Sequence, residues 1–75
     1  MKVFLILTLV KVGQRYENVA IPVSRKTFVK YKRKFSSKIQ CDYNQVIIYA
    51  PVSGLSSYLL EKVFNLAYNY TNSLD

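Results

Sequence analysis

The chain has no histidine and only one cysteine, and both scarcities limit its chemistry. Without histidine, no side chain ordinarily exchanges a proton near neutral pH, so general acid–base catalysis lacks its usual carrier. Cys41 has no partner for an internal disulfide, no histidine to activate it and no Cys/His cluster to complete a metal site. We therefore expect no enzymatic activity, no metal and no cofactor, and we interpret Cys41 as a small, semi-buried apolar residue.

Acidic residues and glycines are also few. The four acids, Glu17, Asp42, Glu61 and Asp75, are scattered along the chain, and metal-dependent nuclease chemistry needs several convergent carboxylates. The two glycines do not form a phosphate-binding loop. The connection 51–54 is a candidate for presenting backbone amides to an anion, although one glycine in such a connection is ordinary loop chemistry.

The length of 75 residues predicts one domain, residues 1–75. A chain this short buries only about 60% of its unfolded surface. Without disulfides or a metal, its stability depends on a well-filled core or on association with a second copy. The apolar run 3–10 is shorter than the roughly 18 residues that cross a bilayer, and no small-residue cleavage site follows it. We expect a cytoplasmic protein with no membrane insertion.

Positive charge is concentrated in one segment. The chain has 11 basic and 4 acidic residues, a formal net charge of +7. Seven of the bases lie in an acid-free stretch, namely Arg25, Lys26, Lys30, Lys32, Arg33, Lys34 and Lys38. Because a concentrated positive field attracts polyanions, these seven residues are the predicted nucleic-acid-binding site.

The apolar periodicity predicts an α+β fold with the order ββαβα. Residues 2–12 and 15–23 read as two strands joined at Gly13, and residues 45–50 as a third. Pro22 belongs at a sheet edge or a strand end, because it cannot donate a ladder hydrogen bond. We expect a two-layer domain in which two helices pack on one face of a three-stranded sheet.

A turn and a final helix complete the predicted order of elements. Residues 42–44 are a turn signal before the third strand, and a final helix begins at Ser53 or Ser56 and continues to about Tyr70. The first strand is apolar on both sides, which is typical of strands buried on both faces. We therefore expect a homodimer that either covers the open face of the sheet or extends the sheet.

The basic segment fits two kinds of secondary structure. On a helix, four apolar residues share one side, namely Phe28, Tyr31, Phe35 and Ile39. Ser24 is then a credible N-cap. On a strand, Val29, Tyr31 and Phe35 alternate with lysines instead. The apolar stripe is cleaner on the helix, so residues 24–38 are interpreted as a helix.

These observations predict a small protein that binds nucleic acid mainly through phosphates. Lysine dominates the segment, and only Arg25 and Arg33 suit the bidentate contacts that read guanine, so sequence preference should be weak. Tyr31 is a candidate for stacking on a base, although a tyrosine in an apolar stripe belongs more often to the core. The sequence does not distinguish DNA from RNA.

Two other interpretations stay open. The same bases suit an acidic protein partner or an anionic membrane surface. With an acidic protein partner, the chain would be a small viral or plasmid accessory protein that acts through protein–protein interaction without nucleic acid. They also suit a solvated face that keeps the protein soluble. Like charges four residues apart, such as Lys26 and Lys30, repel by about a few tenths of a kcal/mol, so a purely solvated face would more often include glutamate.

Overall fold

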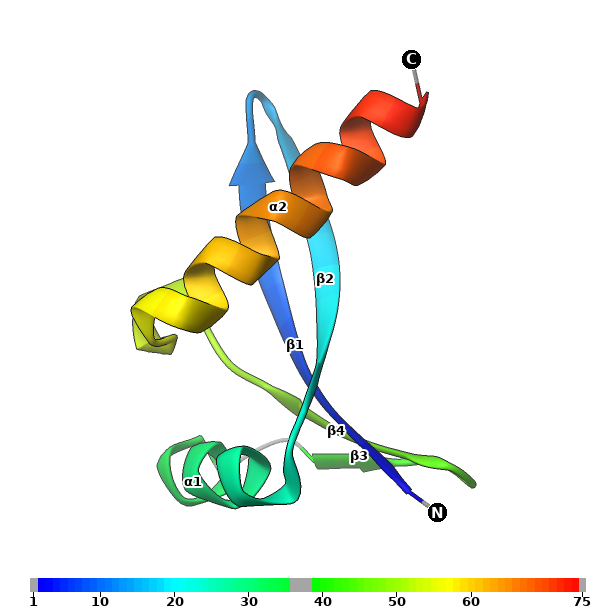
Figure 1. Cartoon of the computed structure of the whole chain (residues 1–75), viewed down its shortest axis with the longest axis vertical. Helices are drawn as coiled ribbons and strands as arrows, with labels where there is room; N and C mark the ends of the chain where they lie inside the picture. Colours follow the sequence, from blue (N-terminus) through cyan, green and yellow to red (C-terminus); the bar gives the residue numbers. More distant parts are fainter. Residues whose placement is uncertain (1, 36–38, 75) are drawn as a thin grey trace.

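The computed structural model describes the backbone of residues 2–35 and 39–74, and side chains as far as Asn69 (Figure 1). Its elements are β1 (Val3–Val12), β2 (Arg15–Val23), α1 (Arg25–Lys34), β3 (Ile39–Cys41), β4 (Gln45–Tyr49), a 3₁₀ turn η1 (Val52–Gly54) and α2 (Ser57–Leu74). The predicted α+β class is confirmed. Figure 1 shows α2 crossing the β1–β2 hairpin, with α1 at the other end of the sheet.

The sheet has four strands in the order β2-β1-β4-β3, so the predicted count of three is wrong by one. β1 runs antiparallel to β2 and parallel to β4, and β3 is antiparallel to β4. The extra strand, Ile39–Cys41, follows from the turn expected at residues 42–44. There the N–H of Asp42 donates to the carbonyl of Gln45 at 2.8 Å, which folds β3 back beside β4.

The β1–β2 hairpin agrees with its predicted strands. Gly13 adopts a φ of 64°, a left-handed conformation that residues with a Cβ adopt at a cost. β2 forms one edge of the sheet, and this is where Pro22 is tolerated without an N–H. Pro22 pairs with Leu5, and the edge position predicted for it is confirmed.

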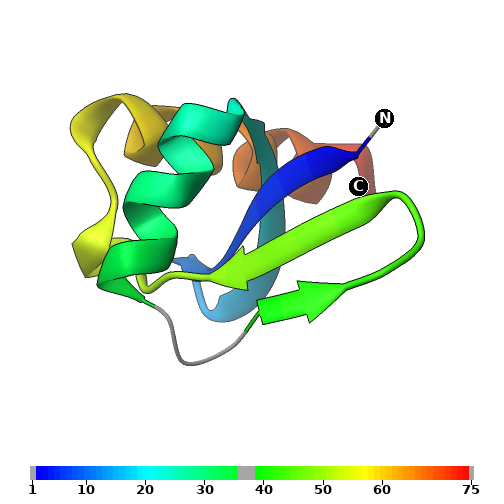
Figure 2. The same cartoon turned by 90° about the horizontal axis from the view of Figure 1, so that it is seen from below.

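Both helices lie on one face of the sheet, where alternate strand residues are buried (Figure 2). These strand residues are Ile6, Thr8, Val10, Val19, Ile21, Val46 and Ile48. α2 covers them with Leu59, Val63 and Ala67, which recur every four residues and therefore share one side of the helix. α1 covers the other end of the face.

The ends of both helices differ from the predicted ones. α1 ends at Lys34, because Phe35 leaves helical geometry, and Ile39 belongs to β3 and not to the helix. Of the two candidate starts of the last helix, Ser56 is the one with capping geometry. Its hydroxyl oxygen accepts a hydrogen bond from the N–H of Leu59 at 3.4 Å, and α2 then continues beyond residue 70 to Leu74.

The opposite face of the sheet is bare in the described part of the chain. Strand alternation and register place five residues at the margins of this face, namely Lys11, Tyr16, Asn18, Gln40 and Gln45. We call the apolar part between them the open sheet face, namely Val3, Leu5, Leu7, Leu9, Ala20, Pro22, Ile47 and Tyr49. All eight side chains are exposed or half-buried. The two-sided apolar character of β1 therefore leaves a row of leucines facing outward.

Candidate nucleic-acid interface

The basic segment forms a capped helix, so the alternative of an exposed strand is wrong. Ser24 has extended backbone geometry, and its side-chain oxygen accepts a hydrogen bond from the N–H of Thr27 at 3.2 Å. The Ser24 hydroxyl in turn donates to Oγ1 of Thr27 at 3.0 Å. The N-cap predicted from the sequence is confirmed, and it fixes where the run of bases begins to wind.

The inner side of α1 holds its aromatic residues. Phe28 is 3% exposed, and its ring centroid lies 5.0 Å from that of Phe4 on β1. Tyr31 is 7% exposed, and its hydroxyl accepts a hydrogen bond from the backbone N–H of Ser56 at 3.0 Å. Tyr31 is thus a core residue, and it has no free ring face to stack on a base.

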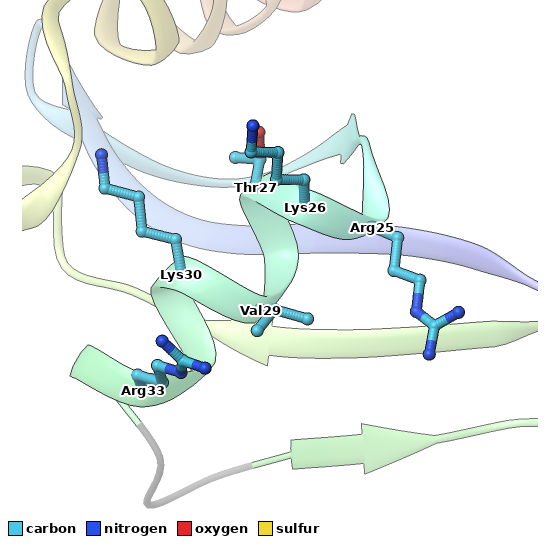
Figure 3. A pocket seen from close by; sticks show the side chains of 6 residues that line it. All are labelled: Arg25, Lys26, Thr27, Val29, Lys30 and Arg33. Atoms are coloured by element: carbon cyan, nitrogen blue, oxygen red, sulfur yellow. The ribbon is translucent and has the colours of Figure 1, made fainter.

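The basic side chains cover the rest of the helix. Six of the seven predicted site residues are described and exposed, namely Arg25, Lys26, Lys30, Lys32, Arg33 and Lys34, and we call them the basic belt. Lys38 lies outside the described residues. Since successive helical residues turn by about 100°, Lys26 and Arg33 lie nearly opposite the buried side of the helix. Figure 3 shows four of these basic side chains, Arg25, Lys26, Lys30 and Arg33, together with Thr27 and Val29. These six residues line an open, shallow space of about 840 Å³.

The belt extends onto both flanks of α1, where two further lysines join it. On one flank Lys32 lines the same hollow as Lys2 and Phe4. On the other flank Lys30 and Lys62 line a cleft between the starts of α1 and α2. Lys2 and Lys62 were not among the predicted site residues. Only the tertiary packing brings them beside α1, so the local run of charge gives no sign of them.

No carboxylate neutralises the belt within the described residues, where its side chains form no ion pair. The one ring contact in the belt places Nζ of Lys34 5.5 Å from the centroid of Phe35. The last turn of α1 carries three bases near the negative end of the helix dipole, but Arg25 and Lys26 occupy the first turn, where the dipole disfavours cations. An anion at the belt would relieve repulsion that nothing in the described fold relieves.

The alternative anion site at residues 51–54 uses part of its backbone amides inside the fold. The N–H of Gly54 donates to the carbonyl of Pro51 at 2.9 Å, and the N–H of Leu55 donates to the carbonyl of Val52 at 3.1 Å. The next amide, of Ser56, is bonded to Tyr31. These three donors are occupied inside the fold, whereas within the described residues the N–H groups of Val52 and Ser53 are not. The connection contains no basic side chain, so the belt remains the stronger candidate for an anion-binding site.

Three further features of the described residues concern the thiol, the metal-ligating side chains and the helices. Cys41 is exposed on β3, so the expectation of a semi-buried residue is wrong. No three of the metal-ligating residue types gather there into a possible metal site. Neither α1 nor the described length of α2 combines the length and apolar character needed to cross a membrane. The chain matches no known family model, no curated protein and no solved structure at a significant level.

Proposed function

We propose that the chain is a non-enzymatic protein that binds nucleic acid through the basic belt, mainly by phosphate contacts and with weak sequence preference. The observation that carries the proposal is the belt itself, six exposed cations without a carboxylate partner on a ten-residue helix. Such a helix is about 15 Å long. Duplex DNA carries about nine backbone charges over that length, enough to engage every base of the belt.

The arrangement favours duplexes over single strands. Proteins that hold single strands usually stack bases on exposed aromatic rings. On α1, Phe28 and Tyr31 are buried, and the apolar residue among the bases is aliphatic, Val29. Tyr58 on α2 is 66% exposed in the cleft beside Lys30, but Nζ of Lys62 already lies 4.6 Å from its ring centroid. The helix α1 itself thus offers cations without a stacking platform, which suits the regular phosphate rows of a duplex.

A matched pair of charge reversals tests the proposal by gel retardation at about 50 mM salt. Lys30→Glu with Arg33→Glu should abolish retardation of a duplex, while circular dichroism stays that of the wild type. The control, Lys11→Glu with Arg15→Glu, makes the same change in net charge at exposed positions on β1 and β2. It should retain most of the affinity. Equal losses in the two variants, or a wild type that retards no duplex, would contradict the proposal.

An acidic protein partner is the second candidate, and Val29 favours it. This side chain is 37% exposed at the centre of the belt, where a protein surface gains from an apolar contact and a phosphate row does not. Val29→Ser should weaken a protein complex and leave duplex binding unchanged. A stoichiometric acidic protein that copurifies with the wild type and is lost with Val29→Ser, without nucleic acid in the preparation, would favour this candidate.

A further inference from the structure

The open sheet face is an apolar surface that the described fold leaves uncovered. Its eight apolar residues span three neighbouring strands, and the charge nearest to them on this face is Lys11, at the end of the β1 row. On β1 the large side chains Leu5, Leu7 and Leu9 form a continuous row. Beside them on β2 the small Ala20 pairs with Leu7, so a raised row lies next to a lower strip. A contiguous apolar patch of this kind marks an interaction surface.

We propose that a second copy of this chain covers the open sheet face, sheet against sheet, and that the dimer bridges two nucleic-acid segments. The first part rests on the sheet alone. The bridging rests on the proposed function of the basic belt. The two parts are tested separately below.

Charge distribution argues for a second copy as the occupant. The chain carries a formal net charge of +7, which by itself opposes self-association. The belt, however, lies on α1, which packs against the other face of the sheet through Phe28 and Phe4. Two sheets packed face to face therefore bury the apolar surface, with Lys11 at its margin, and keep the two belts on opposite outer layers. An acidic partner would instead be drawn to the belt.

The shape of the open sheet face and the symmetry of a dimer also favour a second copy as the occupant. A two-fold axis places the same patch on both sides of an interface, so the patch must complement itself. The leucine row of one copy can lie over the lower strip at Ala20 of the other, as side chains interdigitate between packed sheets about 10 Å apart.

The sheet edges are poorer places for a second copy. β3 offers only three residues for pairing, and β2 contains Pro22, which has no N–H to donate. Of the two modes of association expected from the sequence, the face is thus favoured over extension of the sheet.

The size of the face predicts a dissociable dimer. Three strands are about 14 Å across, and the seven residues 3–9 are about 23 Å long. This footprint falls below the roughly 800 Å² that each partner buries in a standard interface. We expect a dissociation constant in the micromolar range, so the dimer forms and separates over an accessible range of concentration.

The position of α1 determines where the two basic belts lie in the dimer. Each belt faces away from the sheet that carries it, so two sheets separate the belts of the two copies. The belts cannot reach neighbouring phosphates on one short duplex. They can hold two duplexes at once, which makes the dimer a bridge.

Light scattering after size exclusion, from 1 to about 100 μM protein, tests the dimer. The wild type should approach the mass of two chains at the upper end. Leu9→Glu should stay a single chain, and because Leu9 is 40% exposed the fold should tolerate the change, as circular dichroism would verify. Phe64→Glu is the matched control on α2, 45% exposed and away from the face, and should dimerise as the wild type does. A wild type of single-chain mass at 100 μM, or a Leu9→Glu variant that still dimerises, would overturn the inference.

Energy transfer between donor-labelled and acceptor-labelled duplexes tests the bridge. The wild type should bring the labels together, whereas Leu9→Glu should bind each duplex without transfer. A dimeric wild type that binds no duplex contradicts the proposed function and leaves the dimer established. A dimer that binds duplexes without transfer contradicts the bridge alone. Sedimentation with neutral phosphatidylcholine vesicles gives the last outcome, because a monomer that binds them through Leu9 would make a bilayer the occupant and overturn the dimer.

Discussion

The hydroxyl oxygen of Tyr31 accepts a hydrogen bond from the backbone N–H of Ser56, 25 positions away in the sequence and 3.0 Å away in space. The bond joins the middle of α1 to the residue that caps α2. It satisfies an amide that the fold partly buries, and it links α1 to the start of α2.

Removing that acceptor should weaken the fold without touching the belt. Tyr31→Phe leaves the Ser56 amide without its partner, so the free energy of unfolding should fall by about 1 kcal/mol. Urea denaturation measures the loss, and duplex affinity at low denaturant should be unchanged because the hydroxyl faces inward. Tyr68→Phe, at an exposed position on α2, is the control and should have no effect. Equal stability of Tyr31→Phe and the wild type would show that the bond contributes nothing.

Gly54 lies so close to the ring of Phe35 that a Cβ at this position would overlap the end of the ring. Gly54→Ala should therefore lower the free energy of unfolding by about 1–2 kcal/mol, the usual cost of overpacking. Phe35→Leu shortens the side chain and should recover part of that loss in the double variant. A double-mutant cycle from thermal or urea unfolding measures the coupling, and strictly additive losses would contradict the contact.

Thr8 is fully buried among apolar side chains, and its hydroxyl oxygen has no hydrogen-bond partner. Thr8→Val keeps the branched shape and removes the unsatisfied group, so we expect the free energy of unfolding to rise by about 1 kcal/mol. Thr8→Ser keeps the hydroxyl and loses the methyl group, and it should destabilise the protein by a similar amount. If the valine variant proved the less stable of the two, the hydroxyl would have to be making a bond in solution.

Salt dependence should report how many belt residues touch phosphates. Five or six contacts predict that the logarithm of the binding constant falls with the logarithm of salt concentration at a slope of about −5 on duplex DNA. Lys30→Gln with Arg33→Gln should bring the slope to about −3, and Lys11→Gln with Arg15→Gln should leave it near the wild-type value. Fluorescence anisotropy with a labelled duplex gives both slopes. A wild-type slope near −1 would mean that the belt does not bind as a unit.

Local sequence patterns predicted much of this fold. The first hairpin, the edge position of Pro22 and the cap at Ser24 each follow from a preference of the residue or its immediate neighbours. β3 was not predicted, because three residues are too few to show the alternation of apolar and polar side chains that marks a strand. Ile39 is extended because it pairs with Ile48, and that pairing is a tertiary contact.

The candidate site also combines features that are local in the sequence with features that depend on tertiary packing. The run of bases and its helical form are local properties, so the sequence indicates both. The core role of Tyr31 depends on Ser56, and the positions of Lys2 and Lys62 beside α1 depend on how strands and helices pack. No window of the sequence contains these contacts, because each joins segments more than 20 residues apart.

The central place of β1 has a consequence for how the protein is made. β1 pairs with β2 on one side and with β4 on the other, so its second edge has no partner until residues 45–49 have been synthesised. At about 5–20 residues per second, a nascent chain leaving the ribosome spends seconds with a leucine-rich strand half paired. Premature termination between β2 and β4 would yield fragments in which one edge of β1 has no strand to pair with. We expect chaperones to bind such fragments and proteases to degrade them.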